Sequence, residues 1–265
     1  MRILAVIPSR LASTRLPEKP LKDIAGKSLV QRVWEMAKGV PELTDIVVAT
    51  DNETIFNHVE SFGGTAVMTS ESFSTGSERV YGAAQILGNG DPEQFDIILN
   101  IQGDMPLLPR EAVSRLIQFL LEHRDRFQMA TIATPITEEE RFLSNSVVKV
   151  VVTETGEGLY FSRAPIPFPR DASERRSVKT SAASEPVFGF KHLGLYAFTA
   201  KGLSAYNSPA QSSLEQIEKL EQLRVLERGN RIGVVVIEEA LMRDSVEVDT
   251  PDDLARASEI ARGRG

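Results

Sequence analysis

Short apolar segments alternate with amphipathic segments along the first half of the chain, and this alternation limits the fold more than any other feature. The apolar segments lie at Arg2–Pro8, Asp45–Thr50, Ala66–Thr69 and Asp96–Ile101. Segments with helical spacing follow them in turn, at Ser28–Lys38, Asn52–Phe62, Ser77–Leu87 and Arg110–His123. Such strand–helix repeats predict a mostly parallel sheet with helices on both faces. The apolar runs do not alternate with polar residues, which indicates strands buried on both faces.

The second half predicts a smaller, strand-rich lobe and further helices. Strands are expected at Val147–Val152, Leu159–Phe161, His192–Phe198 and Ile232–Ile237. The segment Arg170–Glu185 is rich in Ser, Ala and charge, so we expect a surface or mobile loop there. One long helix is predicted over Ser213–Arg228, with four residues facing inward, namely Leu214, Ile217, Leu220 and Leu223.

Composition narrows the classes of function. The 265 residues include 30 Lys and Arg against 37 Asp and Glu, for a net charge of −7, and no Cys. The lack of Cys excludes a disulfide framework, a thiol nucleophile and Cys-ligated zinc. The acidic balance disfavours nucleic-acid binding, and no apolar run approaches the roughly 20 residues of a membrane span. We therefore expect a soluble, cytoplasmic enzyme that acts on a small molecule.

A loop rich in cations and Pro follows the first predicted strand. Arg10, Arg15 and Lys19 place three cations within ten residues, and only Glu18 opposes them. The loop lies at the carboxyl end of a strand, where α/β sheets bind ligands, so its cations would suit a polyphosphate. The loop matches neither the Walker A nor the GxGxxG pattern. A solvated basic loop explains the same residues equally well.

Two acids stand after segments expected to be strands. Asp104 follows Asp96–Ile101, and Asp249 follows a stretch in which Val246 and Val248 alternate with polar residues. Mg²⁺ takes one or two carboxylates and leaves its other positions to phosphates and water, so this pair would suffice for a Mg²⁺–triphosphate site. A turn explains Asp104 more simply. The pattern of a helix start explains Thr250–Asp253, but it leaves Asp249 unexplained.

Other candidates are spread along the chain. Small hydroxyl residues around a Gly in Thr75–Arg79 would let a flat base approach the backbone, although Ser77 as a helix cap is the simpler explanation. In the second half we single out Arg163, His192 and the pair Glu221-Gln222. A lone His is more often structural than catalytic, and the pair lies on the polar side of its expected helix, where solvation explains it.

In their order and spacing these motifs resemble the 3-deoxy-manno-octulosonate cytidylyltransferases, the CMP-Kdo synthetases. The matching stretches are Ile7-Pro8-Ser9-Arg10, Ser13-Thr14-Arg15-Leu16-Pro17, Lys19-Pro20-Leu21, Thr75-Gly76-Ser77-Glu78-Arg79, Asn100-Ile101-Gln102-Gly103-Asp104, Leu159-Tyr160-Phe161-Ser162-Arg163, His192-Leu193-Gly194-Leu195-Tyr196, Leu214-Glu215, Glu218-Lys219-Leu220-Glu221-Gln222-Leu223-Arg224 and Val248-Asp249-Thr250-Pro251. The resemblance runs from about residue 2 to about residue 256. The sequence departs from it at Met105, where members usually carry Glu, and over Arg170–Glu185.

The resemblance implies a Rossmann-like nucleotidyltransferase fold in one domain. A core over about 1–135 and 225–265 would bind the nucleotide, and a lobe over about 136–224 would bind the sugar and form a homodimer. CTP would be held by Arg10, Arg15, Lys19, Thr75, Gly76, Ser77, Arg79 and Gln102. Mg²⁺ would bind Asp104 and Asp249, which with Arg10 and Lys19 form the catalytic set. The sugar-acid pocket would consist of Arg163, His192, Tyr196, Glu221 and Gln222, with Arg163 on the carboxylate and His192 donating beside it.

The implied reaction joins a sugar acid to a nucleotide. The anomeric hydroxyl of 3-deoxy-D-manno-octulosonate (Kdo) would attack the α-phosphorus of CTP, giving CMP-Kdo and pyrophosphate for lipopolysaccharide biosynthesis. Positioning and charge stabilisation would carry catalysis, without a covalent intermediate. One alternative is the same chemistry on 8-amino-3,8-dideoxy-manno-octulosonate, another sugar acid or a sugar phosphate. The other is a CTP-binding relative that has lost activity.

Overall fold

A computed structural model describes the chain of 265 residues except for residues 12–14, 74, 172–175, 177, 208–209 and 264–265. The described residues form a nine-stranded sheet in the order β11-β7-β10-β6-β1-β4-β5, with β8 paired to β10 and β9 to β8. Its strands are β1 (Ile3–Ser9), β4 (Asp45–Thr50), β5 (Ala66–Met68), β6 (Ile97–Asn100), β7 (Met129–Ile136), β8 (Lys149–Val152), β9 (Gly158–Ser162), β10 (Gly189–Thr199) and β11 (Ile232–Val236). A separate small pair joins β2 (Asp23–Ile24) to β3 (Lys27–Ser28).

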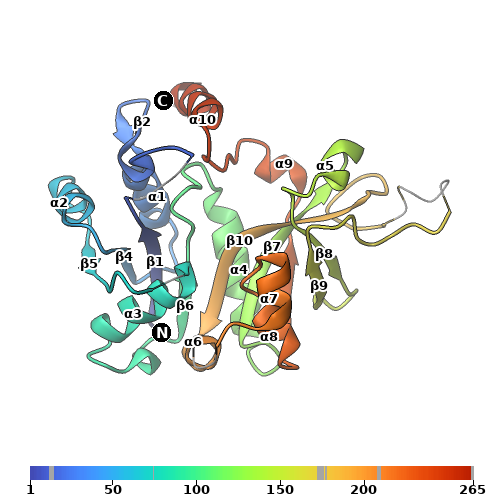
Figure 1. Cartoon of the computed structure of the whole chain (residues 1–265), viewed down its shortest axis with the longest axis horizontal. Helices are drawn as coiled ribbons and strands as arrows, with labels where there is room; N and C mark the ends of the chain where they lie inside the picture. Colours follow the sequence, from blue (N-terminus) through green and yellow to red (C-terminus); the bar gives the residue numbers. More distant parts are fainter. Residues whose placement is uncertain (12–14, 74, 172–175, 177, 208–209, 264–265) are drawn as a thin grey trace.

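The direction of the strands confirms the predicted fold class. β6, β1, β4 and β5 run parallel, as do β7 and β11. β10 runs antiparallel to β6, β7 and β8 and joins the central sheet to the β8–β9 pair. Figure 1 shows β1, β4 and β5 in one half of the molecule and β8 and β9 at the opposite end. The chain is thus an α/β protein with a mostly parallel central sheet and a smaller strand-rich lobe.

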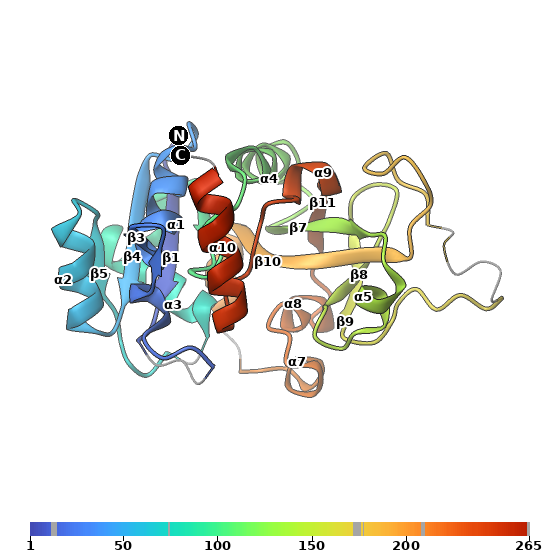
Figure 2. The same cartoon turned by 90° about the horizontal axis from the view of Figure 1, so that it is seen from above.

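Helices cover both faces of the sheet. They are α1 (Leu29–Lys38), α2 (Glu53–Ser61), α3 (Gly76–Leu87), α4 (Arg110–Glu122), α5 (Glu139–Leu143), α6 (Ala200–Asn207), α7 (Ser213–Glu218), α8 (Leu223–Glu227), α9 (Glu239–Met242) and α10 (Pro251–Gly263), with 3₁₀ turns η1 (Lys19–Leu21) and η2 (Pro92–Gln94). Residues Ile3, Ala5 and Ile7 of β1 pack with α1, α4 and α10 in one core, and Leu4 and Val6 pack with α3 and α6 in another. All five side chains are fully buried, as expected for a strand covered on both faces. Viewed from above, α10 crosses the molecule between α1 and β10 (Figure 2).

The single helix predicted over Ser213–Arg228 is wrong. The segment forms α7 and α8, separated by residues 219–222, and Lys219 has the left-handed φ of 55° that ends α7. Ile217, which we expected to face inward, is 76% exposed. Glu221 and Gln222 therefore lie in the segment between the two helices, and Gln222 is buried.

The strand expected before Asp249 is also absent from the described residues. Val246 and Val248 are buried in the core, but the backbone there makes one bond, from Val248 N–H to the Asp104 carbonyl at 2.9 Å, rather than a ladder. In the expected loop Arg170–Glu185, the described residues form no helix or strand apart from an isolated bridge between Val178 and Val187. Among the described residues, no helix is long and apolar enough to cross a membrane.

Candidate functional site

Lys19 joins the two acids that the sequence singled out. Its Nζ donates to Asp104 Oδ2 at 3.0 Å and to Asp249 Oδ1 at 2.8 Å, and Arg15 Nη2 lies 3.0 Å from Asp249 Oδ2. Lys19 comes from the loop after β1, Asp104 from the loop after β6, and Asp249 from the segment before α10. Gly103 allows the loop after β6 to pack closely against the end of β1, because a Cβ at Gly103 would lie only 2.8 Å from the Pro8 carbonyl oxygen. Three separate segments therefore place cations and carboxylates at one sheet edge.

The electrostatics of this cluster depend on its partial burial. Burial raises the pKa of Asp104, and the neighbouring Lys19 ammonium offsets part of this effect. Burial alone would lower the pKa of Lys19, but the carboxylates of Asp104 and Asp249 outweigh it and raise the pKa. Lys19 is therefore a cation at neutral pH, and it lies where phosphate oxygens could replace or join its carboxylate partners.

Arg10 follows the last residue of β1 and contacts residues outside the Lys19 cluster. Its Nη2 donates to the Phe73 carbonyl, and its Nε is 3.9 Å from Asp51 Oδ2. Arg79 is fully buried and donates to the same Asp51 carboxylate and to Thr69 Oγ1. The guanidinium of Arg79 is thus engaged inside the protein, whereas Arg10 is partly exposed; their predicted roles toward CTP stay predictions.

The Thr75–Arg79 stretch begins α3 with a cap that differs from the expected one. Thr75, not Ser77, is the N-cap, and it forms a capping box with Glu78. Ser77 is buried, and its Oγ accepts from Asn100 Nδ2 at 3.2 Å. Thr75 caps because its backbone is extended and its side chain is positioned to accept from the Glu78 N–H. The helix start predicted at Thr250–Asp253 is confirmed by reciprocal bonds between these two residues.

A cleft of about 470 Å³ brings together nine of the predicted site residues. Its lining includes Thr75, Gly76, Gln102, Asp104, Arg163, His192, Tyr196, Glu221 and Gln222. Gln102 Nε2 donates to the Gly194 carbonyl at 2.8 Å, which fixes this side chain beside β10. Asp104 belongs both to the cleft and to the Lys19 cluster, so the cleft opens directly onto the cations and carboxylates.

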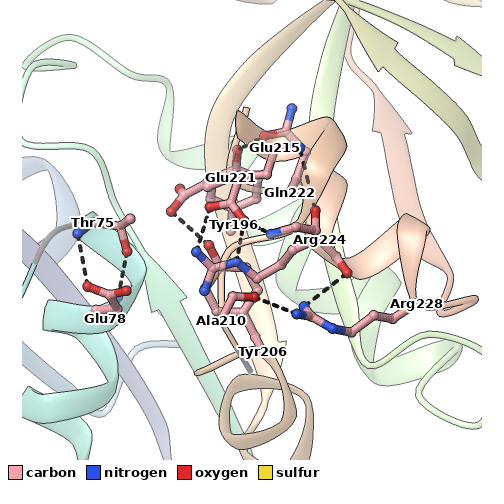
Figure 3. A network of polar contacts seen from close by, with 11 residues as sticks. Thr75, Glu78, Tyr196, Tyr206, Ala210, Glu215, Glu221, Gln222, Arg224 and Arg228 are labelled. Carbon is pink, nitrogen blue, oxygen red and sulfur yellow. Dashed lines mark hydrogen bonds and ion pairs between the residues drawn. The ribbon is translucent and has the colours of Figure 1, made fainter. Parts of the chain in front are cut away.

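A buried polar network supports one wall of the cleft (Figure 3). Tyr196 O–H donates to Gln222 Oε1 at 3.1 Å, and Tyr206 O–H donates to Glu221 Oε2 at 3.0 Å. Burial raises the pKa of Glu221, and the bond from Tyr206 opposes this effect. The amide nitrogen of Gln222 is buried without a hydrogen-bond partner among the described residues.

Behind this wall, an ion pair ties α7 to α8. Arg224 donates from Nε and Nη2 to Glu215 at 2.8 and 2.5 Å, and its guanidinium lies 4.6 Å from the centre of the Tyr206 ring. Because Tyr206 in turn holds Glu221, the pair positions a residue of the cleft.

The guanidinium of Arg163 is hydrogen-bonded to the protein through two of its three nitrogens. Its Nε donates to the Glu218 carbonyl at 3.0 Å and its Nη1 to the Asn145 carbonyl at 3.2 Å. Nη2 makes no hydrogen bond within the described part of the chain. A guanidinium oriented in this way can still donate to a carboxylate in the cleft.

His192 borders the cleft from β10 and is almost fully buried. Its Nε2 lies 3.0 Å from Thr131 Oγ1, and its ring meets Phe161 edge-on at 4.9 Å. Burial, and then the neighbouring Lys191 charge, lower the pKa of His192 to about 3. The imidazole is therefore neutral at neutral pH.

Asp104 and Asp249 can supply two of the oxygen ligands that a divalent cation such as Mg²⁺ requires. Within the described ranges no three His, Asp or Glu gather into a metal cluster. Asp104 and Asp249 do converge on one cationic atom, and two carboxylates with phosphate and water oxygens make a donor set that Mg²⁺ accepts. Met105 occupies the position where members of the family that the sequence resembles usually carry Glu. It is buried between the cleft and a neighbouring cavity of about 900 Å³.

Sequence reasoning missed several residues. Asp51 follows β4 as Asp104 follows β6, so the same signal could have identified it as the partner of Arg10 and Arg79. Tyr206 carried no such signal. Glu215 and Arg224 lie in a stretch that resembles the family, but no local pattern pairs them, because packing sets their contact.

Known proteins resemble this chain over nearly its whole length. The sequence pattern of the family described as Cytidylyltransferase matches residues 4–232. The chain is 41% identical over 254 residues to an 8-amino-3,8-dideoxy-manno-octulosonate cytidylyltransferase of Shewanella pealeana, covering 96% of each chain. It is 42% identical over 256 residues to a 3-deoxy-manno-octulosonate cytidylyltransferase of Desulfosudis oleivorans, covering 97% of this chain and 96% of that one.

A solved structure extends the comparison to three dimensions. CMP:2-keto-3-deoxy-manno-octonic acid synthetase complexed with CTP superposes with a TM-score of 0.86 at 33% identity, covering 100% of both chains. The family match and the full-length relatives confirm the resemblance noted in the sequence. This chain therefore belongs to the cytidylyltransferase family.

Proposed function

We propose that the chain transfers CMP from CTP to Kdo and releases pyrophosphate. The observation that carries the proposal is the cleft itself. Asp104, which meets Lys19 with Asp249 beside it, lines the same cleft as Arg163, whose Nη2 has no hydrogen-bond partner among the described residues. The Lys19 cluster suits a polyphosphate, and the guanidinium of Arg163 suits the carboxylate of a sugar acid. Relatives named for this chemistry, and the likeness to a synthetase complexed with CTP, support the assignment.

The described residues have distinct roles in this reaction. The anomeric hydroxyl of the sugar acid forms a bond to the α-phosphorus of CTP and releases its proton, while the bond from that phosphorus to the pyrophosphate oxygen breaks. Lys19 and Arg15 hold phosphate oxygens and offset the charge that develops on them. Arg163 binds the sugar carboxylate through its Nη2. Holding both reactants in one cleft supplies the orientation that the step requires.

Mg²⁺ is the cofactor that we propose, with Asp104 and Asp249 as the residues that would hold it. When bound, the ion neutralises phosphate charge. The proposal is supported by the two converging carboxylates, which are the hard oxygen ligands that Mg²⁺ prefers.

Two further proposals rest on the family resemblance. The chain would act as a homodimer formed through the lobe at about 136–224, and its product would supply lipopolysaccharide biosynthesis. Light scattering tests the first, and the second follows from the sugar acid that the enzyme accepts.

The test of the proposed function is pyrophosphate release with Mg²⁺ and CTP, with Kdo and 8-amino-3,8-dideoxy-manno-octulosonate offered in parallel. ATP, GTP and UTP serve as nucleotide controls. Release that requires both CTP and Kdo supports the proposal. Release with the amino sugar alone keeps the chemistry and changes the acceptor. CTP binding without release with either acid would favour a relative that has lost activity.

A further inference from the structure

A buried hydroxyl sits at an irregularity in β10. The register between β10 and β7 shifts between Leu193 and Tyr196, directly across from Thr131 on β7. Thr131 is fully buried, and its Oγ1 lies 2.7 Å from the Leu195 carbonyl oxygen, 3.0 Å from that of Leu193 and 3.0 Å from His192 Nε2. One hydroxyl therefore spans the bulge and contacts a ring that borders the cleft.

The protons available to this group decide which atom donates. Carbonyl oxygens can only accept, and the hydroxyl of Thr131 has a single proton, whose nearest acceptor is the Leu195 carbonyl at 2.7 Å. If that proton goes to a carbonyl, the remaining contact is satisfied only when His192 Nε2 carries a hydrogen and donates to Thr131 Oγ1. The other tautomer would leave two acceptor atoms facing each other at 3.0 Å in a dry interior.

We infer that Thr131 is a positioning residue that locks His192 as the Nε2–H tautomer and leaves its Nδ1 as a hydrogen-bond acceptor toward the cleft. Nδ1 makes no hydrogen bond within the described part of the chain. Burial and the adjacent Lys191 keep the imidazole neutral at neutral pH, so Nδ1 is not protonated there. This reverses the donor role that the sequence resemblance suggested for His192 beside the sugar carboxylate.

The acceptor at Nδ1 determines which group of a ligand His192 binds. An acceptor nitrogen binds an O–H group and disfavours a carboxylate oxygen, so His192 would bind a hydroxyl of the sugar acid while Arg163 binds its carboxylate. This assignment of a hydroxyl rests on the proposed function.

The first experiment needs no substrate. In the full-length protein labelled with ¹⁵N-histidine, long-range ¹H–¹⁵N correlation spectra distinguish the two tautomers, and the His192→Gln variant identifies the His192 signals. We expect Nε2 protonated and Nδ1 unprotonated at pH 7.5, with no change down to pH 5. A protonated Nδ1, or a signal that titrates over this range, would overturn the inference whether or not the protein has the proposed activity.

The second experiment separates Thr131 from a merely structural residue. In Thr131→Val the tautomers should mix and the KM for the sugar acid should rise roughly tenfold, with the KM for CTP nearly unchanged. Thr131→Ser restores the hydroxyl and should restore both readouts. Thr134→Val is the matched control, because Thr134 is buried on the same strand and its hydroxyl has no partner among the described residues. A Thr131→Val protein with one tautomer and an unchanged KM would refute the role; if that variant does not fold, the serine variant and the wild-type spectrum decide.

Discussion

Removing one partner of the buried ion pair between Arg224 and Glu215 is expected to destabilise the protein strongly, and Arg224→Met tests this. The two side chains are 2% and 6% exposed and meet through two hydrogen bonds of 2.8 and 2.5 Å. They join α7 to α8 across the break at Lys219. Because the pair is dry, removal of one partner leaves the other charge without solvent or a counterion.

The expected loss in the free energy of unfolding depends on the hydrogen bonds that Glu215 keeps in the variant. Without Arg224 its carboxylate keeps the contact with the backbone N–H of Ser212 at 3.2 Å, which cannot replace a cation. Breaking a buried pair in this way costs about 3–5 kcal/mol in the free energy of unfolding. For a chain of this size that corresponds to a fall in Tm of roughly 6–10 °C.

Urea unfolding followed by circular dichroism measures the loss, and two further variants control it. The double change Arg224→Met with Glu215→Leu removes both charges, and it should recover most of the lost stability. Arg115→Met breaks pairs with Glu111 and Glu238 at a side chain that is 37% exposed, and it should cost less than about 1 kcal/mol. The reasoning is refuted if Arg224→Met loses no more stability than Arg115→Met.

Three other predictions concern the cleft. His192→Gln should flatten the pH dependence of the free energy of unfolding. The folded-state pKa of His192, about 3, lies below that of the unfolded chain, so the wild type loses stability as pH falls below about 6.5. Between pH 7.5 and 5 the wild type should lose about 2 kcal/mol more than the variant in urea titrations. Equal losses would contradict this. Lys19→Met should lower kcat/KM for CTP by roughly 100-fold or more in a pyrophosphate assay with an unchanged circular dichroism spectrum, and a change of a few-fold would count against a phosphate role. Tyr206→Phe removes the donor that holds Glu221, so the KM for the sugar acid should rise roughly 5–10-fold while the KM for CTP stays constant; a matching rise in both would indicate general damage instead.

The elements that were predictable from the sequence are those encoded by local patterns. Buried parallel strands give continuous apolar runs, so β1, β4 and β6 were found close to their observed bounds. The capping pattern at Thr250 needs only neighbouring residues, and the structure confirms it. The predicted helix over Ser213–Arg228 failed because Lys219 adopts a left-handed conformation, and no Gly marks the break.

The features of the site that local patterns do not encode depend on contacts between distant segments. Asp249 was flagged as an acid without a local explanation, but its meeting with Lys19 is set by the packing of α10 and by one backbone bond to Asp104. From the residues alone, Glu221 and Gln222 are explained by a solvated helix face, and only the family resemblance assigned them to the sugar-acid pocket. The break in that helix places them at the cleft. Thr131 carried no motif, because its role arises from a bulge in a neighbouring strand.

The central claim is that the cluster at Asp104 carries phosphoryl transfer in this cleft, and the kinetics of Asp104→Asn test it most directly. Wild-type protein and the variant would be compared for pyrophosphate release from CTP with Kdo, alongside calorimetric CTP binding and thermal unfolding. We predict a kcat lowered by roughly 100-fold or more in a protein that remains folded and still binds CTP. A folded variant whose kcat stays within a few-fold of the wild type would contradict it.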